Sequence, residues 1–134
     1  MRPQAHKRVM LVEDDETLAE MYAIRLKAED FDVMRAENGK VALEDIPRFK
    51  PDLILLDIMM PEMNGIEVLK YLRHQKETRT IPIFILTALS QGRDRTVGLE
   101  AGADDFIIKS ETMPKEVVQK VKVALDAASV AHNF

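Results

Sequence analysis

The sequence predicts an α/β domain with a doubly wound parallel sheet, and three observations support this prediction. The chain has 134 residues, of which 46% are hydrophobic and 31% charged, as in one globular domain. Five short apolar segments alternate with longer segments of helical periodicity. Most of the short segments are apolar almost throughout, as in strands that are covered on both faces. Five strand–helix units joined by right-handed crossovers account for this alternation.

The expected elements follow one another along a single unit, with no repeat and no internal linker. The predicted strands are residues 8–12, 31–35, 53–56, 81–86 and 105–108. The predicted helices are about 16–28, 39–46, 66–74, 93–101 and 114 onward. Pro47 is expected to close the second helix, Gly102 to follow the fourth, and Pro114 to begin the last. We place the domain at residues 7–128 and expect residues 1–6 and 129–134 to be flexible tails.

The overall composition excludes several classes of function. A net charge of −4 and a pI near 5.4 argue against direct binding of this domain to nucleic acid or anionic lipid. No apolar run approaches the roughly 20 residues that span a bilayer. Residues 1–7 lack the apolar stretch of a secretory signal, so we expect a cytoplasmic protein. The absence of cysteine excludes disulfides and thiolate chemistry.

Polar side chains lie where four of the expected strands end. They are Glu13, Asp14 and Asp15 after the first strand, Asp57 after the third, Thr87 at the fourth and Lys109 after the fifth. Each has an ordinary structural explanation, such as a helix cap, a turn, a β-branched strand residue or a solvated charge. Parallel strands, however, end at one edge of the sheet, where such folds bind ligands. We therefore expect these groups to lie together.

The charges of this set predict a cation. Two like charges about 4 Å apart repel by roughly 4 kcal/mol at an effective dielectric constant of 20. Glu13, Asp14 and Asp57 carry three negative charges, which Lys109 and one divalent ion would balance. Oxygen ligands favour Mg²⁺ or Mn²⁺. A carboxylate nucleophile, a metal, an ammonium group and the Thr87 hydroxyl are the parts needed to transfer a phosphoryl group.

Four motifs resemble those of receiver domains from two-component response regulators. They are VMLVEDDE at residues 9–16, PDLILLDIMMPEMNG at 51–65, IPIFILTA at 81–88 and GADDFIIK at 102–109. Their order and spacing match the family over nearly the whole chain. The resemblance implies a flavodoxin-like (βα)5 fold, similar to that of chemotaxis regulators, with strand order 2-1-3-4-5. It also implies a signalling switch rather than an enzyme with a separate substrate.

The resemblance assigns a role to each site residue. Asp57 would accept a phosphoryl group from the phosphohistidine of a sensor histidine kinase or phosphotransfer protein. Asp14, Asp57 and the backbone carbonyl of Met59 would bind the metal, and Glu13 would bind it through a water molecule. Lys109, Thr87 and the N–H of Ala88 would bind phosphoryl oxygens. Asp15 falls one position too late for the acidic pair and is assigned to the helix start.

The resemblance also implies a switch that signals by protein contact. Thr87 would move toward the phosphoryl group, and Phe106 would turn inward, which changes the surface of the fourth helix, fifth strand and fifth helix. The alternative is that Phe106 is an ordinary core residue. A downstream protein target would read the changed surface.

Two features depart from the usual receiver pattern. Ser110 follows Lys109 where the family has a cis proline, so we expect a trans bond or a strained cis bond. The positions that tune hydrolysis of the phosphoaspartate hold the apolar residues Met59 and Leu89. Neither can orient an attacking water, so we expect a long-lived phosphorylated state.

Charges near the fourth and fifth helices resemble those of receivers joined to winged-helix DNA-binding domains, which dimerise through ion pairs. The matching pairs here would be Arg95 with Glu116 and Asp105 with Lys120, and phosphorylation would favour a homodimer. The alternative is an ordinary solvated surface. The chain could be a stand-alone regulator or the receiver of a longer protein.

Three rival functions share this fold or chemistry. A flavodoxin-like cofactor binder needs a Gly- or Ser/Thr-rich phosphate loop after the first strand, which this sequence lacks. A haloacid-dehalogenase-type phosphatase needs a second acid where Met59 stands. A non-phosphorylated pseudo-receiver that acts as a docking module would typically lack Asp57, Thr87 or Lys109, and all three are present.

Overall fold

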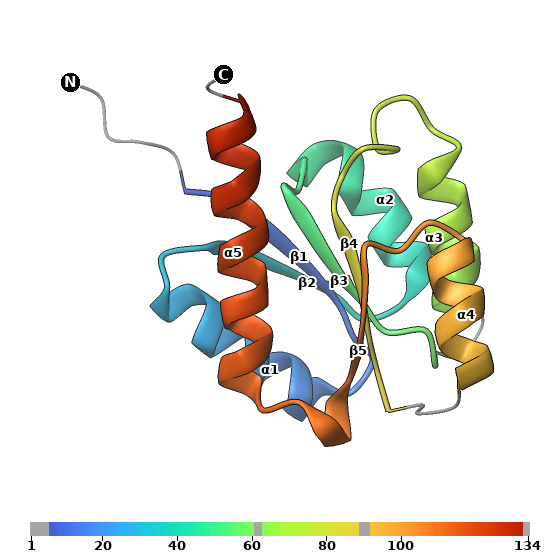
Figure 1. Ribbon diagram of the computed structural model, residues 1–134, viewed down its shortest axis with the longest axis horizontal. Coiled ribbons are helices and arrows are strands. Elements are labelled where there is room, and N and C mark those ends of the chain that lie inside the picture. Colours follow the sequence, from blue (N-terminus) through green and yellow to red (C-terminus); the bar gives the residue numbers. More distant parts are fainter. Residues whose placement is uncertain (1–5, 61–62, 89–91, 133–134) are drawn as a thin grey trace.

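The computed structural model describes residues 6–60, 63–88 and 92–132 and contains one five-stranded parallel sheet between two layers of helices (Figure 1). The strands are β1 (Arg8–Val12), β2 (Asp32–Ala36), β3 (Leu53–Leu56), β4 (Ile83–Thr87) and β5 (Asp105–Ile108). Their order is β2-β1-β3-β4-β5, which confirms the predicted fold and strand order. Because all neighbours are parallel, every strand ends at one edge, called here the carboxyl edge, and begins at the opposite amino edge.

The helices alternate with the strands along the chain. They are α1 (Glu16–Ala28), α2 (Gly39–Phe49), α3 (Gly65–Arg73), α4 (Gly92–Glu100) and α5 (Pro114–His132), with a 3₁₀ turn, η1 (Lys109–Glu111), after β5. Helices α1 and α5 cover one face of the sheet, and α2, α3 and α4 cover the other (Figure 1). None of the helices in the described part of the chain is both long and apolar enough to cross a membrane.

The core consists of two apolar clusters, one on each face of the sheet. Alternate residues of the central strand β3 supply both: Ile54 and Leu56 face α2 and α3, whereas Leu53 and Leu55 face α1 and α5. All four side chains are fully buried. Burial on both faces explains why this strand is apolar throughout instead of alternating with polar residues.

The end of α2 differs most from the sequence-based expectation, and the other predicted bounds shift by at most two residues. Helix α2 continues through Pro47 to Phe49. Pro47 removes a single intrahelical hydrogen bond, and two further residues stay helical before the cap residue Lys50, whose φ of 54° is left-handed. Helix α5 extends to His132, and the domain limits stay a prediction. By contrast, Gly102 follows α4 with φ +112°, as predicted.

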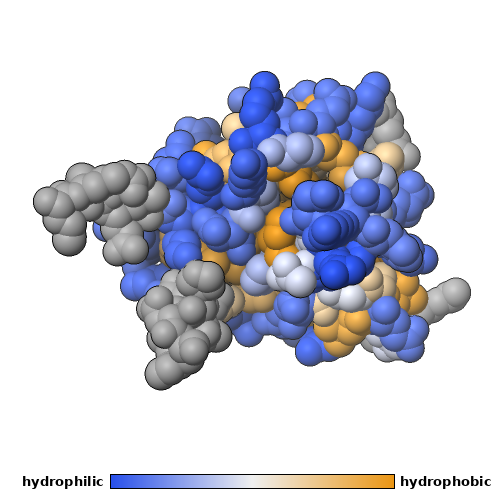
Figure 2. All heavy atoms as spheres, turned by 90° about the horizontal axis from the view of Figure 1, so that it is seen from above, coloured by the Kyte–Doolittle hydropathy of each residue, from blue (hydrophilic) through white to orange (hydrophobic). Residues whose placement is uncertain are grey.

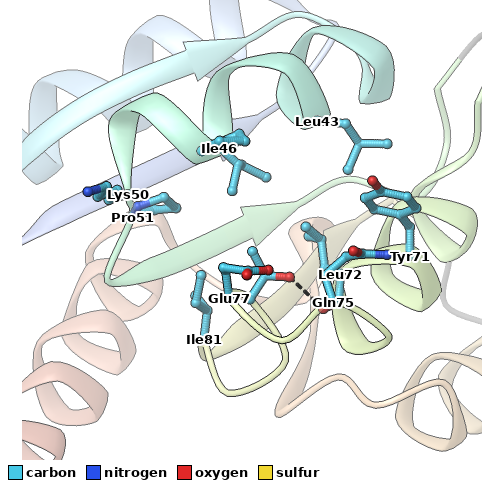
Figure 3. A pocket seen from close by; sticks show the side chains of 11 residues that line it. Leu43, Ile46, Lys50, Pro51, Tyr71, Leu72, Gln75, Glu77 and Ile81 are labelled. Carbon is cyan, nitrogen blue, oxygen red and sulfur yellow. Dashed lines mark hydrogen bonds between the residues drawn. The ribbon is translucent and has the colours of Figure 1, made fainter.

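An apolar groove of about 450 Å³ lies at the amino edge between α2 and α3 (Figure 3). Its lining includes Ile46, Tyr71, Leu72 and Ile81. Seen from this end, the surface is mainly hydrophilic, and apolar side chains show between the charged ones (Figure 2). Glu13, Asp14, Asp57, Thr87 and Lys109 do not line this groove, because they lie at the opposite, carboxyl edge.

Candidate functional site

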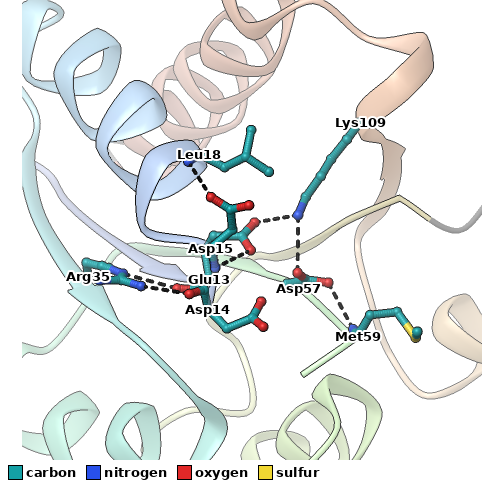
Figure 4. Close-up of polar contacts among 8 residues, drawn as sticks. All are labelled: Glu13, Asp14, Asp15, Leu18, Arg35, Asp57, Met59 and Lys109. Carbon is teal, nitrogen blue, oxygen red and sulfur yellow. Dashed lines mark hydrogen bonds and ion pairs between the residues drawn. The ribbon is translucent and has the colours of Figure 1, made fainter. Parts of the chain in front are cut away.

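The carboxyl edge brings the predicted polar residues together from different strands (Figure 4). Glu13 and Asp14 follow β1, Asp57 follows β3, and Lys109 follows β5. Thr87 is the last residue of β4, and its side chain is fully buried. The parallel register sets Thr87 beside Ile108, the residue before Lys109. Residues that are 96 positions apart in the sequence thus share one site.

Asp57 is held at the centre of this site. It is only 4% exposed, and its N–H donates to the carbonyl of Val12 at 3.0 Å, which anchors it to β1. Carboxylate atom Oδ1 accepts a hydrogen bond from the N–H of Met59 at 2.9 Å. Atom Oδ2 accepts one from Lys109 Nζ at 3.1 Å. Hydrogen bonds on both oxygens fix the orientation of this carboxylate.

Lys109 joins the two buried carboxylates. Its Nζ donates to Glu13 Oε1 at 2.5 Å as well as to Asp57 Oδ2. Burial, the largest single influence, lowers the pKa of Lys109, but the hydrogen bond with Glu13 and the charges of Asp57 and Glu13 together raise it above its usual value. Lys109 is therefore a cation at neutral pH.

Glu13 is the most deeply buried acid of the site. Its side chain is 1% exposed, and its Oε2 accepts a hydrogen bond from the N–H of Asp15 at 3.2 Å. Burial raises the pKa of Glu13 to about 7, and the negative charge of Asp57 adds to the rise, although Lys109 opposes it. Among the described residues, three carboxylates share this site, and Lys109 is the cation whose side chain contacts two of them.

The three acids fit a divalent cation. Glu13, Asp14 and Asp57 each offer a carboxylate oxygen, and these oxygens lie within 4.8 Å of one another. Clustered carboxylates of this kind suit a hard cation such as Mg²⁺ or Mn²⁺. The hydrogen bond from the Met59 N–H to Asp57 keeps the Met59 backbone beside the acids, while its side chain is 57% exposed. The carbonyl of Met59 as a ligand remains a prediction.

Local structure explains how the sequence forms this edge. Asp15 caps α1 by accepting a hydrogen bond from the N–H of Leu18 at 3.0 Å, as expected from its position after the acidic pair. Gly65 begins α3 directly against the segment after β3. A Cβ at Gly65 would lie 2.4 Å from the carbonyl oxygen of Asp57, so only glycine fits at this point.

One functional candidate was missed by the sequence reasoning. Arg35, near the end of β2, donates from Nε to the carbonyl of Glu13 and from Nη2 to the carbonyl of Asp14, both at 3.1 Å. It lies outside all four motifs, and an arginine near the end of a strand resembles any solvated charge. Only the β1–β2 register, which pairs Leu11 with Arg35, could have indicated its proximity to the acidic pair.

The residues assigned to the switch lie on β4 and β5. Phe106 is 4% exposed and packs in the cluster beneath α4, where a Cβ on Gly98 would lie 3.3 Å from its ring. An ordinary core residue and an inward switch residue would both have this position. Ala88 is exposed directly after Thr87. Leu89 lies outside the described residues.

The residues proposed to pair between protomers lie near α4, β5 and α5. Lys120 Nζ lies 3.2 Å from Asp105 Oδ2 within the same chain. Arg95 and Glu116 are exposed, and Glu116 Oε1 accepts a hydrogen bond from the N–H of Met113 at 3.4 Å. These contacts leave the dimer prediction untested.

The Lys109–Ser110 peptide bond is trans, one of the two conformations expected for a bond without proline. No peptide bond within the described segments is cis. The chain continues from Lys109 directly into the 3₁₀ turn η1, and the lysine side chain still reaches both Glu13 and Asp57. The replacement of proline thus leaves Lys109 aimed at the acidic cluster.

Comparison with known families identifies the chain. Residues 9–122 match the family described as the response regulator receiver domain. The chain belongs to this family. The match runs from β1 into the first half of α5 and includes all the residues of the acidic site. It confirms the predicted signalling-domain class and the link to two-component systems.

Curated relatives and solved structures agree with this assignment. The receiver is 40% identical over 126 residues to the alkaline phosphatase synthesis transcriptional regulatory protein PhoP of Bacillus subtilis, covering 94% of this chain and 51% of PhoP. It is 44% identical over 119 residues to the DNA-binding response regulator MtrA of Mycobacterium tuberculosis, covering 89% of this chain and 50% of MtrA. This receiver therefore spans about half the length of these curated relatives.

Among solved structures, a putative response regulator from Chloroflexus aurantiacus superposes with a TM-score of 0.84 at 34% identity, covering 91% of this chain and 99% of that one. The BeF3-activated N-terminal receiver domain of RstA from Klebsiella pneumoniae gives a TM-score of 0.81 at 36% identity, covering 87% and 97%. The fold of this receiver is therefore that of solved receiver domains.

Proposed function

We propose that this receiver accepts a phosphoryl group on Asp57 from the phosphohistidine of a sensor histidine kinase or phosphotransfer protein, with Mg²⁺ or Mn²⁺ bound at the carboxyl edge. The observation that carries the proposal is the convergence of three carboxylates with one buried lysine. A structural ion pair needs one acid for each base. The excess of acid at this edge instead favours a site that takes up a cation and a reactant.

The proposed transfer is an in-line attack by Asp57. One carboxylate oxygen forms a bond to phosphorus as the P–N bond to the histidine breaks, and the electron pair of that bond goes to the imidazole nitrogen. A bound divalent cation would supply neutralisation of the charge on the transferring group. Lys109 would bind a phosphoryl oxygen with the charge that its raised pKa maintains. The Thr87 hydroxyl and the Ala88 N–H would bind the others.

The proposed ligands are Asp14, Asp57 and the Met59 carbonyl, with Glu13 acting through water. Glu13 is the most buried of the three acids, and Lys109 already occupies its Oε1, which supports an indirect role. Asp14 is exposed, which supports direct contact with an ion that enters from solvent.

The proposed output is a change in the surface of α4, β5 and α5. Movement of Thr87 toward the phosphoryl group would alter the packing of Phe106, since β4 and β5 are paired through Ile85 and Phe106. A downstream protein, or a second copy of the chain paired through Arg95, Asp105, Glu116 and Lys120, would read the change. Relatives are named as DNA-binding regulators, so we propose that a DNA-binding segment elsewhere in a longer protein is the part controlled. Partnership with a sensor kinase implies a cytoplasmic location.

Phosphotransfer in Mg²⁺ tests the acceptor role. The receiver is incubated with phosphoramidate, which needs no cognate partner, and with a panel of phosphorylated histidine kinases. We expect the mass of one phosphoryl group on the peptide that contains Asp57, and none in Asp57→Asn or in excess chelator. An unmodified wild-type chain that still binds a kinase would favour the pseudo-receiver alternative.

Sedimentation tests the proposed dimer. We expect a monomer without modification and a shift toward dimer after beryllofluoride treatment, which Lys120→Glu reverses. A monomer under both conditions would reject the dimer while leaving phosphorylation of Asp57 unaffected.

A further inference from the structure

We infer that Arg35 is a positioning residue for the metal site and acts by fixing the backbone of Asp14. The inference rests on the proposed function, because it assumes that a divalent cation binds at the carboxyl edge. Arg35 belongs to β2, the edge strand next to β1, and lies outside every motif that defines the acidic site.

The two hydrogen bonds of Arg35 flank one residue. Its Nε donates to the carbonyl of Glu13 and its Nη2 to the carbonyl of Asp14, both at 3.1 Å (Figure 4). These carbonyls belong to the peptide groups before and after the Cα of Asp14. Fixing both peptide planes fixes φ and ψ of Asp14, and therefore the direction of its Cα–Cβ bond.

Asp14 needs this support more than the other two acids. Glu13 and Asp57 are 1% and 4% exposed, and both accept a hydrogen bond from Lys109. Asp14 is exposed on the segment between β1 and α1, where packing does not hold its side chain. The backbone conformation of Asp14 therefore determines the direction in which its carboxylate points.

The sheet keeps Arg35 in place for this task. Arg35 pairs with Leu11 in the β1–β2 register, and the ladder continues past β1 through a hydrogen bond from the N–H of Glu13 to the carbonyl of Ala36 at 3.0 Å. The planar guanidinium presents two donors in a rigid fork that matches two successive carbonyls. A lysine at this position keeps the charge but cannot make both bonds in a fixed geometry.

The test measures Mg²⁺ affinity of the unphosphorylated chain by titration calorimetry, with Mn²⁺ binding by electron paramagnetic resonance as a second readout. The variants are Arg35→Lys and Arg35→Gln. Arg73→Lys is the matched control, because Arg73 also donates to backbone carbonyls but lies at the amino edge. We expect Arg35→Lys to weaken Mg²⁺ binding about tenfold, as for other residues that orient metal ligands. Arg73→Lys should leave it unchanged within about twofold.

A double-mutant cycle separates positioning from general destabilisation. Since Arg35 acts through Asp14, Arg35→Lys should cause no further loss of Mg²⁺ affinity in an Asp14→Asn background. Wild-type affinity in both Arg35→Lys and Arg35→Gln, or an undiminished loss in the Asp14→Asn background, would overturn the inference alone. A wild-type chain that binds neither Mg²⁺ nor Mn²⁺ would overturn the proposed function together with it.

Discussion

The two edges of the sheet each carry a buried or half-buried cation, but they use it differently. At the amino edge, Arg73 donates to the carbonyls of Gly102 at 2.9 Å and Ile81 at 2.7 Å and pairs with Asp104 at 2.8 Å. The same Asp104 oxygen accepts from the N–H of Ile83 at 2.8 Å. At the carboxyl edge, Lys109 serves two buried carboxylates, and a third lies beside them.

The difference between the edges lies in charge balance. At the amino edge, Arg73 pairs with one acid, Asp104, and donates its other hydrogen bonds to backbone carbonyls. Its interactions are therefore complete within the chain. At the carboxyl edge three carboxylates share the charge of Lys109, because the guanidinium of Arg35 donates to backbone carbonyls and not to the acids. Hydrogen bonds and ion pairs that are satisfied within the chain have a structural role. Carboxylates that outnumber the cation in contact with them are suited to bind a metal cation and an anionic reactant. The following predictions test this contrast.

Removing Lys109 should have the largest effect on stability. Lys109→Met leaves Glu13 and Asp57 buried without their cation, and breaking such a pair costs roughly 3 kcal/mol of unfolding free energy. Because the defect is missing positive charge, Mg²⁺ should restore part of it. Urea unfolding at pH 8 in chelator and in Mg²⁺ measures both effects. A loss that Mg²⁺ leaves unchanged would contradict the charge-balance account.

Removing Arg73 should destabilise the fold less than removing Lys109, and Mg²⁺ should not restore the lost stability. We expect Arg73→Met to cost about 2 kcal/mol, because its side chain is 17% exposed and Asp104 is 51% exposed. The same unfolding series checks this, with Mg²⁺ affinity as the control. Recovery of stability in Mg²⁺ would show that the two edges are not distinct.

The dependence of the unfolding free energy on pH should follow the titration of the Glu13 carboxyl group. Its folded pKa of about 7 lies above its usual value, so its contribution is present at acidic pH and is lost as the pH rises through 7. Between about pH 5.5 and pH 7 the unfolding free energy should fall by about 1 to 2 kcal/mol relative to Glu13→Gln. Parallel urea curves for the two proteins measure this. A difference that is constant with pH would place the pKa of Glu13 near its ordinary value.

The apolar side chain of Met59, two residues after Asp57, should slow loss of the phosphoryl group. Met59 offers no polar side-chain group to orient a water, and we expect Met59→Asn to speed dephosphorylation about tenfold, equivalent to about 1.4 kcal/mol in the barrier. Loss of phosphate from Asp57 over time is the measurement. Fast loss in the wild type that is unchanged in Met59→Ala and Leu89→Ala would reject the predicted long lifetime.

The fold could be predicted from the sequence because the apolar pattern and the motif resemblance indicate the same architecture. Apolar strands such as residues 53–56 predicted burial on both faces, and the motif resemblance predicted the strand order. The acidic set was predictable because parallel strands end at one edge. The predicted end of α2 at residue 46 is three residues short, because Pro47 costs the helix one hydrogen bond without ending it.

The arginines that bind backbone carbonyls were harder to predict. Arg35 and Arg73 act on backbone carbonyls, and a carbonyl has no sequence signature. Arg73 reaches Gly102, which is 29 positions away, and Arg35 reaches Glu13 across the strand pair. Only the register of the sheet and the paths of its loops bring such partners together. Side-chain-to-backbone contacts at long range therefore required the structure.

The most direct test of the central claim is the unfolding free energy of the wild-type receiver as a function of Mg²⁺ concentration at constant ionic strength. If the carboxyl edge lacks positive charge, stability should rise with Mg²⁺, by about 2.7 kcal/mol at 100 times the dissociation constant. Asp14→Asn should weaken this dependence. A wild-type stability that is the same with and without Mg²⁺ would contradict the account, because the three acids would then be balanced by the chain alone.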